Sequence, residues 1–119
     1  MNSPQDFANW ASGRGIHLSP AQLQQFEAYK ANLLDWNTRV NLTAITDNAG
    51  VWQKHFADSL TLWPWLEAAQ TTGTPARFID VGTGAGFPGL PVKIAWPDVF
   101  VTVGVGVPVT VNTPEAVAA

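Results

Sequence analysis

The chain has 119 residues and a net charge of −3, which favours one small domain or part of a larger one and gives no overall attraction to nucleic acid. It contains no cysteine, which excludes disulfides and thiolate metal sites and agrees with a reducing compartment. No apolar run approaches the ~20 residues of a membrane span, and the start of the chain has no secretory signal pattern. We therefore expect a cytoplasmic protein with neither a membrane partner nor a metal.

The first part of the chain has the pattern of amphipathic helices. Ser3-Pro4 begins a short helix that Gly13 ends, and Ser19-Pro20 begins a second one with a capping-box pattern. We expect this second helix over Pro20–Asn37, because apolar residues recur along it at helical spacing: Leu23, Phe26, Tyr29, Leu33 and Trp36.

Two further helical pieces are predicted before the chain changes character. One begins after Asp47 or Asn48, and the other covers Ser59–Leu66. Residues 70–75 are rich in Thr and Gly and predict a linker. We expect a helical N-terminal part over residues 1–75, followed by an α/β part.

A glycine-rich run from Phe78 to Leu90 is the centre of the functional reading. Its apolar start predicts a buried strand, with Phe78, Ile79 and Val81. Glycines that let a ligand approach the backbone then alternate with other residues: Gly82, Gly84 and Gly86. A helix over about 89–96, ended by Pro97, is expected to follow. Strand, glycine turn and helix form the first unit of a doubly wound α/β fold, where ligands bind.

The ligand class is read from the position of Asp80. The stretch Gly84–Gly89 matches G-x-G-x-x-G, but the first turn glycine is Gly82, so the register is wrong for a dinucleotide. Asp80 lies two residues before Gly82, and a carboxylate there suits a ligand with cationic groups such as S-adenosylmethionine. The alternative, that Asp80 only bonds the amides of the turn, stays open.

Two groups of polar residues upstream carry weaker signals. Asn37, Asn41 and Thr43 are more often residues that satisfy the backbone of a turn than ligand contacts. His55 and Asp58 are the one pair of histidine and carboxylate at helical spacing, and a structural hydrogen bond is favoured there over general-base chemistry.

Three motifs together carry a resemblance to a known family. The pattern Asp80-Val81-Gly82-x-Gly84-x-Gly86 resembles the first motif of class I S-adenosylmethionine-dependent methyltransferases. The longer run to Pro91 resembles the ribosomal RNA small-subunit methyltransferase G family, also called glucose-inhibited division protein B. Two upstream motifs resemble the same family: Trp36-Asn37-x-x-x-Asn41-Leu42-Thr43 and His55-x-x-Asp58-Ser59. The resemblance covers roughly Ser19 to Thr102.

The resemblance implies a helical segment followed by the start of a Rossmann-like class I methyltransferase fold. It implies methyl transfer from S-adenosylmethionine to N7 of a guanine in 16S ribosomal RNA by a monomer. The cofactor-binding residues would be Gly82, Gly84, Gly86, Phe87 and Asp80, with His55, Asp58 and Ser59 as support close to the pocket. No catalytic residue is expected, because guanine N7 already carries a lone pair and needs only positioning. The RNA-binding surface would lie largely outside this chain.

The last part of the chain departs from the family pattern. A second strand is expected over Asp98–Thr102, so the α/β part would be residues 76–102. A ribose-binding carboxylate is expected near Val105, yet the only acid in 101–119 is Glu115. We therefore expect residues 103–119 to be a disordered or frameshifted tail and the methyltransferase fold to be truncated, leaving this chain inactive alone. A non-catalytic fragment and a nicotinamide-dinucleotide-binding Rossmann protein are the alternatives.

Overall fold

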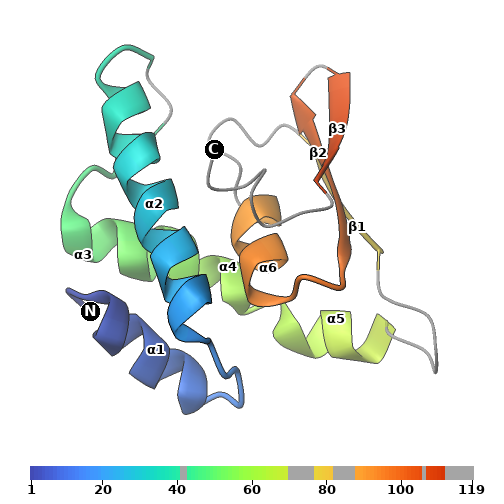
Figure 1. The fold of residues 1–119 in the computed structure, drawn as a ribbon. Coiled ribbons are helices and arrows are strands. Elements are labelled where there is room, and N and C mark those ends of the chain that lie inside the picture. The colour runs from blue at the N-terminus through green and yellow to red at the C-terminus, as the bar shows by residue number, and fades with distance from the viewer. Residues whose placement is uncertain (41–42, 70–76, 82–87, 106, 112–119) are drawn as a thin grey trace.

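The computed structural model describes residues 1–40, 43–69, 77–81, 88–105 and 107–111. Helices make up most of the first 69 residues, and a strand, a helix and two further strands follow (Figure 1). In chain order the elements are α1 (Pro4–Ser12), α2 (Pro20–Asn37), α3 (Asn48–Gly50), η1 (Val51–Ala57), α4 (Asp58–Leu60), α5 (Trp63–Ala69), β1 (Arg77–Val81), α6 (Gly89–Ala95), β2 (Phe100–Val105) and β3 (Val107–Val111).

Side-chain caps fix where the first two helices begin. The Ser3 hydroxyl accepts a hydrogen bond from the Asp6 amide at 3.1 Å, ahead of α1. The Ser19 hydroxyl accepts from the Gln22 amide at 3.1 Å, and the Ser19 amide donates back to Gln22 Oε1 at 2.7 Å. This reciprocal capping box satisfies two amides that the helix cannot. The start of α1 and both bounds of α2 are therefore as the sequence predicts.

The next helical segment runs without a break from α3 through η1 to α4. The Asp47 carboxylate caps its start by accepting from the Gly50 amide at 2.8 Å, as expected. The middle of the segment, Val51–Ala57, is wound as a π-helix, a rare form that occurs often at functional sites. The helical piece expected over Ser59–Leu66 is divided instead, because α5 begins at Trp63 with Pro64 in its first turn, where proline is tolerated.

The strands form a mixed sheet with the order β1-β2-β3. β1 is parallel to β2, with Arg77 opposite Phe100. α6 lies between these strands in the chain, as the helix of a βαβ unit. β2 is antiparallel to β3, with Val105 opposite Val107. The described residues thus contain the predicted βα unit and second strand but not an all-parallel Rossmann sheet. β2 also reaches Val105 rather than Thr102, because valine continues the β-prone pattern.

An aromatic core joins α1, α2 and η1. Phe7 is fully buried, with its ring centre 4.9 Å from that of Phe26 and 5.3 Å from that of Trp52. Phe56 completes the cluster, 5.2 Å from Phe26 and 5.4 Å from Trp52. Such aromatic contacts contribute about 0.5–1.5 kcal/mol each beyond the area they bury. The core continues into the α/β part through fully buried side chains that include Leu60, Val92, Ile94, Val99 and Val101.

The C-terminal end of α6 is held by two polar side chains. Gln22 Nε2, from α2, donates to the carbonyl oxygens of Ile94 at 3.0 Å and Ala95 at 3.1 Å. Lys93 is 2% exposed, and its ammonium donates to the carbonyl oxygens of Pro97 at 2.5 Å and Val99 at 3.0 Å. Burial lowers the pKa of the Lys93 ammonium, and the Asp98 carboxylate opposes this shift. The helical part and the βαβ unit are thus bonded directly to each other.

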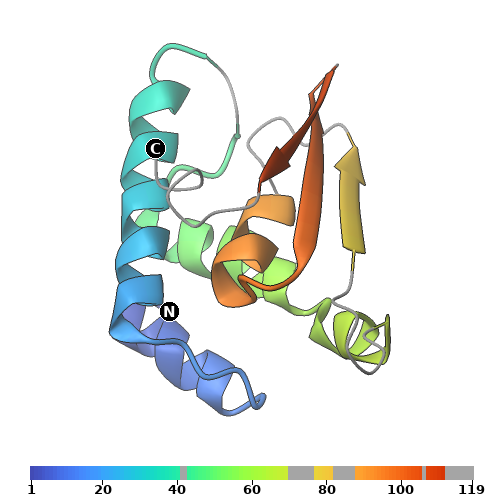
Figure 2. The ribbon, with the colours of Figure 1, turned by 45° about the vertical axis from the view of Figure 1, so that its right-hand side comes forward.

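Two apolar residues that the sequence places in the core are exposed. The strand β1 was expected to be buried, but Ile79 is 70% exposed, because α6 covers only one face of the sheet (Figure 2). Trp36 is 51% exposed at the end of α2, where the Arg39 guanidinium lies 5.1 Å from its ring centre.

Among the described residues, no helix is long and apolar enough to cross a membrane.

Candidate functional site

A chain of hydrogen bonds joins the two upstream motifs at His55. The Thr43 hydroxyl lies 2.8 Å from His55 Nε2 and accepts from the Ile45 amide at 3.1 Å. The Thr43 amide in turn donates to Asn37 Oδ1 at 2.9 Å. The expectation that Asn37 and Thr43 bond a turn is therefore confirmed, and the same bonds hold the His55 ring in place. Asn41 lies outside the described residues.

The environment of His55 favours its neutral form. Burial lowers the pKa of the imidazole below its ordinary value, and the Asp58 carboxylate opposes this by raising it. The ring projects from the π-wound segment, and Asp58 follows at the start of α4. The neutral ring has one donor and one acceptor nitrogen, so it can orient a ligand without repelling a cation.

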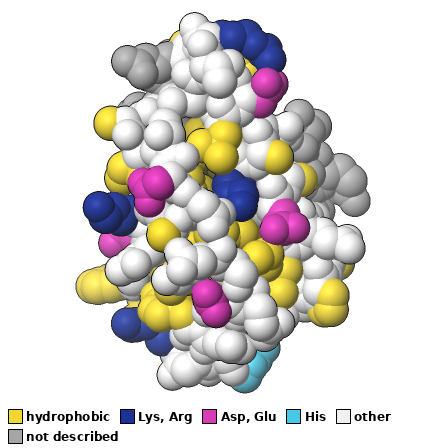
Figure 3. Space-filling model, turned by 90° about the vertical axis from the view of Figure 1, so that its left-hand side faces the viewer, with side chains coloured by type: hydrophobic (Ala, Val, Ile, Leu, Met, Phe, Trp, Pro, Cys, Tyr) yellow, Lys and Arg dark blue, Asp and Glu magenta, His cyan; other side chains and the backbone are white. Residues whose placement is uncertain are grey.

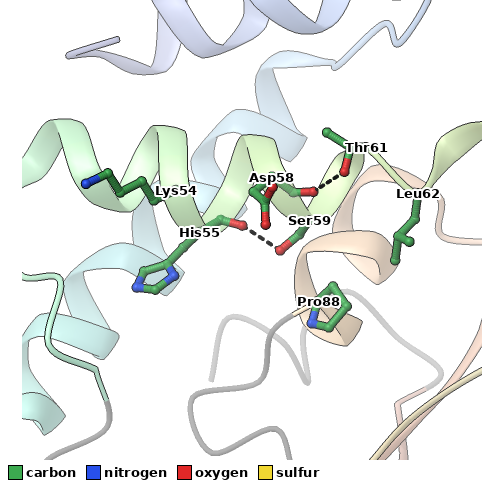
Figure 4. A pocket seen from close by; sticks show the side chains of 7 residues that line it. All are labelled: Lys54, His55, Asp58, Ser59, Thr61, Leu62 and Pro88. Carbon is green, nitrogen blue, oxygen red and sulfur yellow. Dashed lines mark hydrogen bonds between the residues drawn. The ribbon is translucent and has the colours of Figure 1, made fainter.

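A cavity of about 360 Å³ lies beside His55. Its lining combines η1, α4 and the turn that follows them with Pro88, the described residue just before α6 (Figure 4). The lining residues are Lys54, His55, Asp58, Ser59, Thr61, Leu62 and Pro88. Ser59 is 5% exposed, and its hydroxyl donates to the His55 carbonyl at 2.5 Å, which fixes one wall. The cavity thus brings the His55 motif next to the end of the glycine-rich run.

The predicted cofactor-binding residues fall mostly outside the described part of the chain. This applies to Gly82, Gly84, Gly86 and Phe87, and also to the linker expected over 70–75. The backbone of Asp80 lies in β1 and pairs with Val103 of β2, so Asp80 stands at the end of the strand that leads into the glycines. Its side chain is outside the described residues. Within the described residues, no three His, Cys, Asp or Glu side chains gather as a metal site.

Sequence reasoning missed part of the cavity wall. Lys54 is exposed and lines the cavity next to His55. Leu62 lines it from the turn at 61–62 that follows α4, and no spacing rule indicates that placement. Pro88 could have been found, since it belongs to the Asp80–Pro91 run.

The charges on the face formed by α1 and α2 are dispersed. Figure 3 shows Lys and Arg side chains that stand apart, with Asp and Glu between them. Arg39 is paired with Asp35 at 2.7 Å, which cancels its charge locally. On this face the described residues therefore form no continuous basic surface.

Comparison with known proteins assigns the family. The family described as rRNA small subunit methyltransferase G matches residues 22–103. This chain is similar to proteins named Ribosomal RNA small subunit methyltransferase G. Those from Halalkalibacterium halodurans, Bacillus subtilis and Roseiflexus sp. are 47%, 43% and 49% identical to it. The alignments cover 82%, 83% and 78% of this chain, but only 40%, 40% and 38% of the relatives. The chain thus spans about 40% of the length of the curated relatives it matches. The chain belongs to the rRNA small subunit methyltransferase G family.

Proposed function

We propose that this chain is part of an enzyme that transfers a methyl group from S-adenosylmethionine to N7 of a guanine in 16S ribosomal RNA. The observation that carries the proposal is the cavity, which unites the family's His55 motif with the end of its glycine run. The relatives are named as methyltransferases of small-subunit ribosomal RNA, which supports the substrate class. We infer that the enzyme acts as a monomer in the cytoplasm, where this RNA is found.

The cavity supports S-adenosylmethionine as the methyl donor. Its volume of about 360 Å³ lies within the range of small-molecule sites. Asp58 supplies a carboxylate at its wall, and the lowered pKa of His55 favours a neutral ring, so His55 adds no positive charge to that of Lys54 on the same wall. Both features suit a ligand that carries a sulfonium and an ammonium group. We propose that the cavity holds part of the donor.

We assign the closest donor contacts to the glycine run. Gly82, Gly84 and Gly86 would let the donor approach the backbone, and Phe87 would supply an apolar contact. Asp80 would act at the amino-acid end, consistent with its place at the end of β1. We also propose that the domain has a class I methyltransferase fold, in which β1 and α6 form the first βα unit.

The proposed chemistry requires positioning rather than proton transfer. When bound, S-adenosylmethionine supplies an electrophilic methyl group on a sulfonium. Guanine N7 has a free lone pair, so no residue of this chain has to remove a proton. The chain's residues would align donor and base and exclude water, which accounts for large rate enhancements by itself. We therefore assign no catalytic residue.

We further propose that methyl transfer needs the part of the family domain outside the match. The net charge of −3 gives no overall attraction to RNA, and the face in Figure 3 has Asp and Glu side chains between its Lys and Arg side chains. The helical part over 1–75 and the α/β part over 76–102 would then form one side of the active site. The composition of 103–119 marks a tail of different origin. The different origin of the tail can be tested by translating its coding DNA in three frames. A frame that encodes a carboxylate at the end of the second strand, followed by a loop with Lys or Arg, would support it. If no frame encodes these features, the proposed origin is refuted.

The direct test is a methyl-transfer assay. A chimera would join residues 1–102 of this chain to the part of the Bacillus subtilis relative outside the match. Unmodified 16S RNA and methyl-labelled S-adenosylmethionine should yield 7-methylguanosine after digestion to nucleosides, while this chain alone should yield none. Label on another base, or a chimera that binds a nicotinamide dinucleotide in place of S-adenosylmethionine, would overturn the proposal.

A further inference from the structure

A second cavity shares one residue with the cavity beside His55. Its volume is about 270 Å³, and Thr61, in the turn that follows α4, lines both cavities. The rest of its lining comes from the loop between α1 and α2, from α4 and from the start of α5 (Figure 1). The lining residues are Arg14, Ile16, Leu60, Thr61, Trp63 and Pro64. We call it the Arg14 cavity.

Backbone hydrogen bonds fix the position of Arg14 at this cavity. The amides of Arg14 and Ile16 both donate to the Ala11 carbonyl, at 2.9 Å each. Gly15 between them has a φ of 79°, a left-handed conformation that glycine adopts without strain. The turn therefore ends α1, places Ile16 in the core and leaves Arg14 at the rim of the cavity.

Among the described residues, the guanidinium of Arg14 has no carboxylate partner. It lies 4.9 Å from the ring centre of Trp10. An aromatic ring attracts the cation but offers no oxygen to its N–H groups. These donors are therefore available to an anion, and the planar guanidinium can bind a carboxylate through two parallel hydrogen bonds.

The other walls of the Arg14 cavity are mostly apolar. Leu60 is fully buried beneath it. The ring of Trp63 is stacked on that of Trp96, with 4.7 Å between the ring centres and 8° between the planes. Trp96 thus covers one face of the Trp63 ring and leaves the other face or the edge to the cavity. The Thr61 hydroxyl donates to the Asp58 carbonyl at 2.5 Å, so its proton is already used.

We propose that the Arg14 cavity binds a small aromatic carboxylate. The carboxylate pairs with Arg14, and the flat ring lies against Trp63 and above Leu60. The volume of about 270 Å³ is slightly below the usual range of small-molecule sites, which limits the ligand to about one or two fused rings. The inference stands apart from methyl transfer, because it uses neither the glycine run nor the cavity beside His55.

The lining argues against other ligand classes. A cation is repelled by Arg14, and a neutral apolar ligand would cover the guanidinium without replacing the water bound to it, which is costly. A nucleoside monophosphate brings a second negative charge, and Arg14 is the one cation in the lining. A compact ligand with a single negative charge is therefore favoured.

The test compares three ligands by calorimetric titration into the 119-residue chain. 2-Naphthoate is the probe, and 2-naphthamide keeps its ring but has no charge. The acid should bind with a Kd below about 1 mM, as a well-enclosed ligand of this size can. The amide should bind at least about tenfold more weakly, because hydrogen bonds to a charged group contribute that much. Adenosine 5′-monophosphate should also bind more weakly than the acid.

Variants and spectra locate the site. Arg14→Gln should weaken 2-naphthoate at least about tenfold and leave 2-naphthamide unchanged, with the same circular dichroism as the wild type, since Arg14 is exposed. Arg39→Gln is the matched control, because Arg39 is also exposed but pairs with Asp35 away from the cavity. With ¹⁵N-labelled tryptophan, 2-naphthoate should shift the indole signal of Trp63, assigned by Trp63→Phe, and not that of Trp36.

Four results would each overturn the proposal. They are no binding of 2-naphthoate, equal binding of the acid and the amide, equal losses in the two arginine variants, and tighter binding of the nucleotide than of the acid. A loss of methyl transfer in the chimera would leave the proposal standing, because none of these measurements uses S-adenosylmethionine or RNA.

Discussion

The Thr43 hydroxyl lies 2.8 Å from Nε2 of His55, and this contact joins two motifs that are 12 residues apart. Thr43 closes the loop after α2, and His55 projects from the π-wound helix toward the cavity. The Ile45 amide donates to the oxygen of the same hydroxyl at 3.1 Å, so the hydroxyl proton is still available for a hydrogen bond to the ring. The loop and the cavity wall therefore depend on one side chain.

Replacing Thr43 with valine should destabilise the protein. The change keeps the shape of the side chain but removes the bonds to His55 and to the Ile45 amide. The expected loss is about 1–2 kcal/mol in the free energy of unfolding, measured by urea denaturation. Thr46→Val is the control, because Thr46 is exposed and should change stability by less than about 0.5 kcal/mol. Equal effects of the two variants would contradict the assigned role of Thr43.

The stability of the protein should decrease in mild acid because of His55. Burial lowers its pKa below the ordinary 6.5, so the unfolded chain binds more protons than the folded chain as the pH falls below 6.5. The stability contributed by the neutral ring is present above pH 6.5 and is lost as the pH falls through the lowered pKa. His55→Gln should flatten the stability profile between about pH 7.5 and 5. A stability profile of His55→Gln that stays as steep as that of the wild type in this range would refute the assignment.

Gln22 should contribute more to stability than other glutamines on α2. Its side chain accepts from the Ser19 amide and donates to the carbonyls of Ile94 and Ala95. Gln22→Leu leaves these groups without their partner and should cost about 1–3 kcal/mol. Gln24→Leu, at an exposed position of the same helix, should be nearly neutral. Thermal unfolding of both variants decides between them: a similar melting temperature would mean that α6 is not held by α2.

The elements that local chemistry determines could be predicted from the sequence. The capping box at Ser19 and the apolar stripe of Phe26, Tyr29 and Leu33 fix both bounds of α2. Asp47 likewise marks the start of the next helix through its bond to Gly50. In each case the residues that define the element are within a few positions of one another, so spacing is sufficient.

Features that depend on distant parts of the chain could not be predicted. Ile79 has the pattern of a buried strand residue, but its exposure depends on what covers the second face of the sheet. No spacing rule indicates the π-winding of Val51–Ala57, and Pro88 and His55 line one cavity although they are far apart in the sequence. The site was therefore predicted as motifs, and the structure supplies the hydrogen bonds and the cavity that join two of them.

The central claim is that the glycine run, of which the described Pro88 lines this cavity, holds the methyl donor. The most direct measurement is calorimetric titration of S-adenosylmethionine into the chimera of residues 1–102 with the rest of the Bacillus subtilis relative. We predict one site that Gly82→Val abolishes, since a side chain there would occupy the donor's place. Gly13→Val is the control for adding a valine, because a Cβ at Gly13 lies at an ordinary 3.5 Å from the nearest atom, the Trp10 carbonyl oxygen. Unchanged affinity in the Gly82→Val chimera would contradict the account.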